Sequence, residues 1–179
     1  MYIKYTEDLM QYALTRGGNL FDYGRYAVVP NVSWGLGLNH EADLLCLSRN
    51  DVFNEIEIKV SKSDLKKDKE KKWGHYSRFI RHLWFAVPET IDVDFALEHI
   101  PEYAGLVYVE SYKGVRSSIR FKTRIIRKPR PRRRPGIFQK PETKTIIKFL
   151  RLGVLRMWTD THRFNEYIDL KTEEDCNDC

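Results

Sequence analysis

The segment 39–73 constrains the fold of this 179-residue chain more than any other part of its sequence. Two apolar-rich runs, 42–48 and 52–60, flank a polar turn at 49–51, and this pattern predicts a β-hairpin. A lysine-rich stretch follows directly and predicts a helix over 62–79, in which Gly74 offers a break. The segment therefore predicts strand, turn, strand and helix in immediate succession.

Acidic side chains fall on one face of this hairpin. Because side chains alternate along a strand, Glu55, Glu57 and Lys59 share one face of the second strand. On the first strand, Glu41 and Asp43 fall on the face that continues with leucines. Carboxylates are costly on a buried sheet face unless something compensates them. A divalent cation held by Asp43 and Glu57 is the simplest compensation.

Simpler interpretations of the same residues remain open. Glu57 and Lys59 also fit an exposed charge pair on a half-solvated strand, and Asp43 fits an acid at a strand start. Glu55 lies one strand repeat, about 6.6–6.8 Å, from Glu57 and is expected outside the innermost shell of metal ligands. His40 is expected to be a loop residue, although its position beside the hairpin would let it touch a phosphate.

Asp43, followed by Glu57-Ile58-Lys59, resembles the D…(D/E)-x-K motif of the PD-(D/E)XK nuclease superfamily. The sequence that continues from this motif, KVSKSDLKKDKEKKWGHY, is similar to the MmcB-like branch, whose members are assigned as DNA-repair nucleases. Ala42 stands where the superfamily motif has its proline, so the assignment of the first carboxylate depends on spacing.

The resemblance implies an α/β fold with a restriction-endonuclease-like αβββαβ core, in which helices flank a mixed central sheet, and a basic C-terminal helical extension. It also implies a site for phosphodiester hydrolysis that uses Mg²⁺ or Mn²⁺. Asp43, Glu57 and the backbone carbonyl of Ile58 would hold the metal. Lys59 would orient or deprotonate the attacking water, or hold the scissile phosphate.

The first helix is expected over Thr6–Arg16, where Thr6 caps its start and paired glycines stop it. Glu7 is the candidate for the additional acid that such nucleases often carry on this helix. An acid that only favours the helix N-terminus is the alternative. Pro30 implies that the following strand is an edge strand or bulged. The other expected elements are strands at 25–34, 82–87, 104–111 and 115–126, and helices at 94–100 and 143–158.

Positive charge is unevenly distributed along a chain whose net charge is +6. A basic body suggests a polyanionic partner, most often nucleic acid. The lysine-rich helix taken alone is equally well explained as a solvated surface. The candidate nucleic-acid-binding residues are Lys62, Lys66, Lys67, Arg127, Arg130, Arg132, Arg133 and Arg134.

Length predicts a single domain over 1–170, with its core at about 5–126, the basic segment and helix at 127–160 and an acidic flexible tail at 171–179. No apolar run approaches a membrane span and no secretory signal is visible, so a cytoplasmic location is expected, nucleoid-associated or in a phage host. Cys176 and Cys179 have zinc-like spacing, but a zinc site needs further ligands, and free thiols are expected.

The sequence therefore predicts a metal-dependent DNA nuclease, in the first place an endonuclease, in repair, recombination or phage DNA processing. Branched, single-stranded or damaged DNA would suit these roles, and a homodimer remains open. Two alternatives remain. One is a DNA-binding protein on this fold that has lost cleavage, and the other is an RNA-processing nuclease.

Overall fold

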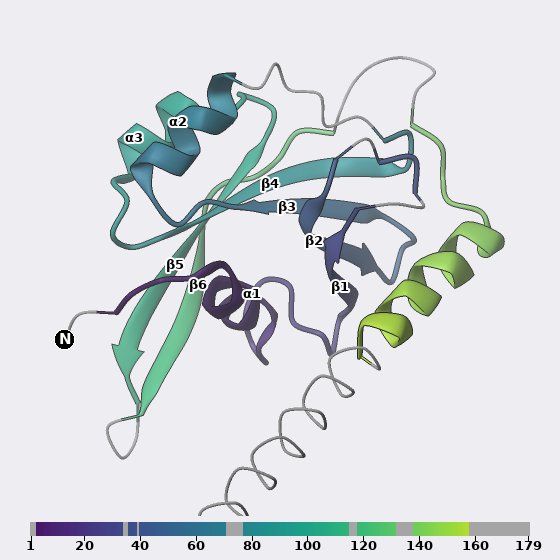
Figure 1. Ribbon diagram of the computed structural model, residues 1–179, viewed down its shortest axis with the longest axis horizontal. Coiled ribbons are helices and arrows are strands. Elements are labelled where there is room, and N and C mark those ends of the chain that lie inside the picture. The colour runs from purple at the N-terminus through teal and green to yellow at the C-terminus, as the bar shows by residue number, and fades with distance from the viewer. Residues whose placement is uncertain are drawn as a thin grey trace, which may run out of the picture.

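The computed structural model describes residues 3–33, 36–38, 40–70, 77–114, 118–131 and 138–157. Its centre is a six-stranded sheet with the strand order β1-β2-β3-β4-β5-β6 (Figure 1). The elements along the chain are α1 (Glu7–Thr15), β1 (Tyr26–Val32), β2 (Ala42–Ser48), β3 (Phe53–Ile58), α2 (Lys62–Glu70), β4 (Ile80–Pro88), α3 (Val93–His99), β5 (Gly105–Lys113), β6 (Ile119–Arg127) and a helix over 143–157. The predicted αβββαβ order and the α/β class are confirmed.

The sheet is mixed, as predicted. β1, β2 and β3 pair antiparallel, β3, β4 and β5 pair parallel, and β6 returns antiparallel to β5. Parallel neighbours need a crossover, and α2 and α3 supply the two crossovers. β1 is an edge strand, as Pro30 predicted. At an edge, the missing N–H of proline does not interrupt the hydrogen bonding of a central strand.

Helix α1 covers one face of the sheet. Thr6 caps it as predicted, because its side chain accepts a hydrogen bond from the Leu9 N–H. Met10 and Leu14 are fully buried and belong to the same core cluster as Ile56 on β3. The apolar side chains of the helix therefore pack against the apolar side chains on one face of the sheet, in a single layer.

The opposite face carries two separate apolar clusters. α2 and α3 pack over β4 and β5, and the helix 143–157 packs over β1, β2 and the start of β3 (Figure 1). Phe149 of that helix is fully buried and meets Phe53 edge-on, with ring centroids 5.0 Å apart. Its Arg156 Nη2 donates to the Asn31 carbonyl on β1 at 2.6 Å. On β3, Glu55 lies between these two clusters, because its strand partners are Leu45 of one and Leu83 of the other.

One predicted boundary is wrong. The predicted helix extends to Phe79 with a break at Gly74, whereas α2 ends at Glu70, residues 77–79 are not helical and β4 begins at Ile80. The Ser77 hydroxyl accepts a hydrogen bond from the Phe79 N–H and donates one to the Leu36 carbonyl, so a local turn stands in place of helix at residues 77–79.

Several predicted features lie outside the described residues. They are residues 71–76 of the predicted lysine-rich helix, Arg132, Arg133, Arg134, the final residue of the predicted helix 143–158, Cys176, Cys179 and the tail 171–179. None of the helices in the described part of the chain has the length and apolar character needed to cross a membrane.

Candidate functional site

Asp43 and Glu57 meet where β2 begins and β3 ends. Leu44 pairs with Ile56 in the antiparallel register, so Asp43 and Glu57 are the next residues to face each other. The Asp43 Oδ2 accepts a hydrogen bond of 2.6 Å from the Ile58 backbone N–H. The first carboxylate of the motif is therefore bound to the peptide that follows the second.

Lys59 and Glu57 form a buried ion pair. The Lys59 Nζ donates to Glu57 Oε2 at 3.1 Å, and their side chains are only 8% and 4% exposed. The interpretation as an exposed charge pair is therefore wrong. The Lys59 backbone N–H also donates to the Ala86 carbonyl on β4 at 3.0 Å, which fixes the residue just beyond the end of β3.

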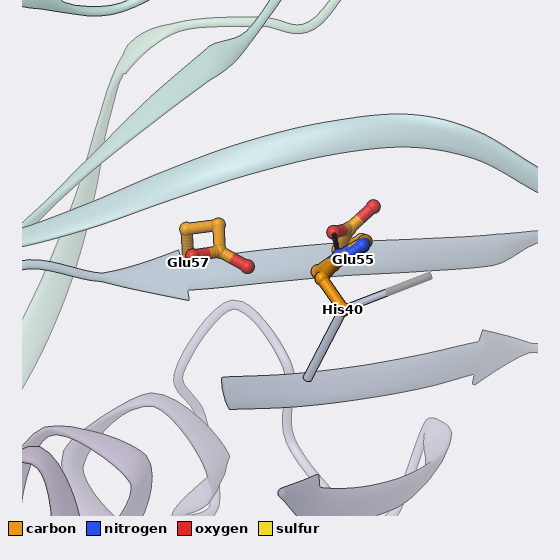
Figure 2. Close-up of side chains that lie close together, drawn as sticks. All are labelled: His40, Glu55 and Glu57. Carbon is orange, nitrogen blue, oxygen red and sulfur yellow. Dashed lines mark hydrogen bonds and ion pairs between the residues drawn. The ribbon is translucent and has the colours of Figure 1, made fainter. Parts of the chain in front are cut away.

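Glu55 is fully buried between apolar neighbours. Its strand partners are Leu45 on β2 and Leu83 on β4. A carboxylate in such surroundings requires a polar or cationic partner. His40, in the loop before β2, provides one through contact between its Nε2 and Glu55 Oε1 (Figure 2).

His40, Glu55 and Glu57 can together hold a metal ion. Each offers one ligand atom, and these atoms lie within 4.8 Å of one another. Ligands placed about 2.1–2.4 Å from a common cation would be separated by no more than about 4.2–4.8 Å, so the spacing fits. Two carboxylates and an imidazole suit Mn²⁺ and similar metals, whereas Mg²⁺ prefers oxygen alone. Asp43 stands beside this cluster, held by the Ile58 N–H.

Helix α1 brings a further acid toward the site. Burial and the nearby Asp43 carboxylate raise the pKa of Glu7, and Lys59 opposes the shift. Gln11 links the helix to β2, because its Nε2 donates to the Asp43 carbonyl at 2.9 Å and to Glu7 Oε1 at 3.2 Å. The N-terminal half of α1 is thus attached to the strand that carries the first carboxylate.

The predicted lysines lie on the outer surface of α2, close to the end of β3. The Nζ atoms of Lys62 and Lys66 lie 5.0 Å and 5.7 Å from the centroid of the Phe95 ring on α3. Lys62, Lys66 and Lys67 are exposed. Their ammonium groups are available to an anionic ligand, while the aromatic ring limits where two of them can lie.

Arg127 has a structural contact. Its guanidinium donates to the Ala104 carbonyl at 2.8 Å and to the Pro101 carbonyl at 2.6 Å, which fixes the connection between α3 and β5. Burial lowers the pKa of this group, assisted by the nearby Arg130. Arg130 itself is exposed.

Three residues of the site were not identified from the sequence as members of it: His40, Glu55 and Gln11. Glu55 had a usable signal, because it shares a strand face with Glu57, but the expected strand repeat placed it too far away. In the structure the side chains of Glu55 and Glu57 approach each other, so that their ligand atoms lie within 4.8 Å. The positions of His40 and Gln11 depend on tertiary packing, and local sequence carries no signal for them.

Comparison with known proteins gives one family and one similar structure. Residues 6–133 match the family described as "DNA repair protein MmcB-like", a span that includes Asp43, Glu57 and Lys59. No curated protein matches the chain. The solved SPO1766 protein of unknown function from Silicibacter pomeroyi is similar, with a TM-score of 0.51 and 16% identity over 80% of this chain and 82% of that chain. This likeness supports the fold alone.

Proposed function

The chain belongs to the MmcB-like DNA repair protein family, and from this premise we propose that it is a metal-dependent nuclease that hydrolyses phosphodiester bonds in DNA. Family membership indicates a role in DNA repair and DNA as the partner. The observation that carries the proposal is the buried Glu57–Lys59 pair, with Asp43 on the facing strand.

The carboxylates of Asp43 and Glu57 and the carbonyl of Ile58 would hold the cation, with His40 and Glu55 beside them. When bound, Mg²⁺ or Mn²⁺ would acidify a water molecule and stabilise negative charge on the phosphoryl oxygens. The polypeptide supplies the acids at the ends of two adjacent strands, so their separation is set by the hydrogen-bonded ladder and not by a flexible loop.

Lys59 would act on the reacting groups directly. An ammonium group has several N–H donors, so it can keep its bond to Glu57 while it binds a phosphate oxygen or a water molecule. Holding phosphate and orienting water are both compatible with this position.

Phosphate contacts would come from exposed cations, of which the α2 lysines are nearest to the site in sequence. Lys62, Lys66 and Lys67 lie on the helix that follows Lys59, and Arg130 follows β6. Arg132, Arg133 and Arg134 would extend this contact. Binding through phosphates predicts strong salt dependence and little sequence preference.

The test is cleavage of labelled single-stranded, duplex and branched DNA with Mg²⁺ or Mn²⁺, alongside RNA of the same sequence. Lys59→Ala and Asp43→Asn should bind DNA and fail to cut it. Lys140→Ala is the matched control, because its side chain is 71% exposed and pairs with Asp51 at the surface. Binding without cleavage by the wild type and both variants alike would instead identify a DNA-binding protein that has lost cleavage. Preferential cutting of RNA would identify an RNA-processing nuclease.

A further inference from the structure

A second concave site lies between the C-terminal end of α1 and the β5–β6 hairpin. It is a cavity of about 430 Å³, within the range of small-molecule sites. Five of its lining residues are aromatic or cationic: Tyr12 in α1 and Arg16 at its C-cap, and Tyr112, Arg120 and Phe121 in the hairpin strands. Its chemistry therefore differs from that of the acidic site.

The lining presents flat aromatic rings and guanidinium groups to solvent. Tyr12 is 48% exposed and Tyr112 is 44% exposed. The Arg16 Cζ lies 4.8 Å from the centroid of the Tyr12 ring, so a guanidinium and an aromatic ring already stack at the rim. Among the described residues that line this cavity, none carries a carboxylate. The pocket is thus suited to an anion with a planar group.

The two walls of the cavity are joined by hydrogen bonds. The buried Asn19 Nδ2 donates to the Ala13 carbonyl in α1 at 2.6 Å and to the Phe121 carbonyl in β6 at 3.3 Å. Close by, the Leu20 N–H donates to the Thr123 Oγ1 at 3.0 Å. Because these bonds fix the end of α1 against β6, the cavity is formed before any ligand enters, and binding would require little ordering.

We propose that this pocket binds an unpaired nucleotide of a DNA substrate, with the base stacked on Tyr12 or Tyr112 and its phosphates on Arg16 and Arg120. Aromatic stacking and arginine–phosphate contact are the means by which proteins hold single strands. A paired base inside a duplex cannot offer its face to a tyrosine. The pocket therefore selects DNA that has an unpaired segment.

The pocket lies at a useful distance from the acidic site. Glu7, whose carboxylate interacts with Asp43 and Lys59, is the first residue of α1, and Arg16 is its C-cap, so the nine-residue helix of about 13 Å separates them. That distance corresponds to about four stacked nucleotides. The inference rests on the proposed function to this extent: the strand held in the pocket is the one that would reach Lys59.

The test measures binding of a short fluorescein-labelled oligothymidylate, and of a duplex of the same length, to the full chain in EDTA. Tyr12→Ala should weaken single-strand binding about 10-fold. Arg16→Ala should also weaken it and lower the slope of log affinity against log salt by about 0.7. Duplex affinity should change less than about 2-fold. Tyr23→Ala and Arg49→Ala are the matched controls, because both residues are exposed and neither lines the cavity.

The inference is overturned if the pocket variants bind the single strand as the controls do, if duplex affinity falls equally, or if the wild type does not bind the single strand. Cleavage by the wild type with metal is measured separately. Loss of single-strand binding in the variants without any cleavage by the wild type would support the pocket and contradict the nuclease. Cleavage with unaffected variants would support the nuclease and contradict the pocket.

Discussion

The Asp43 carboxylate on β2 accepts a 2.6 Å hydrogen bond from the backbone N–H of Ile58 on β3. Ile58 is the residue between Glu57 and Lys59. The hydrogen bond therefore fixes the backbone from which both of these side chains extend. Asp43 therefore has a structural contribution that is separate from any bound metal, and variants at this position can distinguish the two.

Asp43→Ala removes a hydrogen bond to a charged acceptor and should lower the free energy of unfolding by about 1.5–3 kcal/mol. Asp43→Asn keeps an oxygen at the same place and should lose clearly less. Urea denaturation measures both, and cleavage should be lost in both. Equal destabilisation by Ala and Asn would show that the negative charge, and not the acceptor atom, fixes the Ile58 peptide.

Lys59→Met should destabilise the protein by about 3–5 kcal/mol, because it leaves the buried Glu57 carboxylate without its ammonium partner. Adding Glu57→Gln to Lys59→Met should restore part of that loss, since no charge then remains in the pair. A double-mutant cycle of unfolding free energies measures the coupling. Simple additivity of the two changes would show that the pair contributes no mutual stabilisation.

The hairpin and the order of elements could be predicted because their signals are local. The polar turn at 49–51 separates two apolar-rich runs, and Pro30 marks an edge strand. The same alternation placed Glu57 and Lys59 on one face, and the structure puts them in contact.

The end of α2 and the role of His40 could not be predicted in this way. The non-helical turn at residues 77–79 depends on the hydrogen bond from the Ser77 hydroxyl to the distant Leu36 carbonyl, which local sequence does not reveal. His40 reaches Glu55 across the strand pair, and its neighbours in sequence give no indication of that contact.

The helix 143–157 should depend on Phe149 for its attachment to the sheet. Phe149→Ala removes a fully buried ring that packs on Phe53 and should cost about 3–5 kcal/mol of unfolding free energy. Leu150→Ala is the matched control, because Leu150 is 45% exposed and the change should cost little. Thermal and urea unfolding measure both variants, and similar losses would contradict this packing.

Stability at high pH should depend on Tyr5. Its hydroxyl donates to Glu89 Oε1 at 2.8 Å, and burial is the main cause that raises the pKa of Tyr5 from 10.0 to about 12. A raised pKa favours the neutral phenol in the folded state, so this stabilisation is complete below pH 10 and is lost as pH rises through about 12.

Tyr5→Phe should therefore flatten the decline of unfolding free energy between pH 10 and about 12. At neutral pH it should cost about 1 kcal/mol for the missing hydrogen bond. Tyr23→Phe serves as the control, because Tyr23 is 63% exposed. An unchanged pH profile in Tyr5→Phe would assign the alkaline loss to other groups.

The protection of the β1 edge affects whether separate molecules aggregate at high concentration. Pro30 has no N–H for an incoming strand, and Arg156 occupies the Asn31 carbonyl on the same edge. At the far edge, Arg120, Lys122 and Arg124 alternate along β6, and these long charged side chains, two of them paired with Glu110, hinder the approach of another strand. Both borders of the sheet thus resist intermolecular strand addition, the route by which exposed β-edges lead to aggregation. A chain without the helix 143–157 would lose part of this protection.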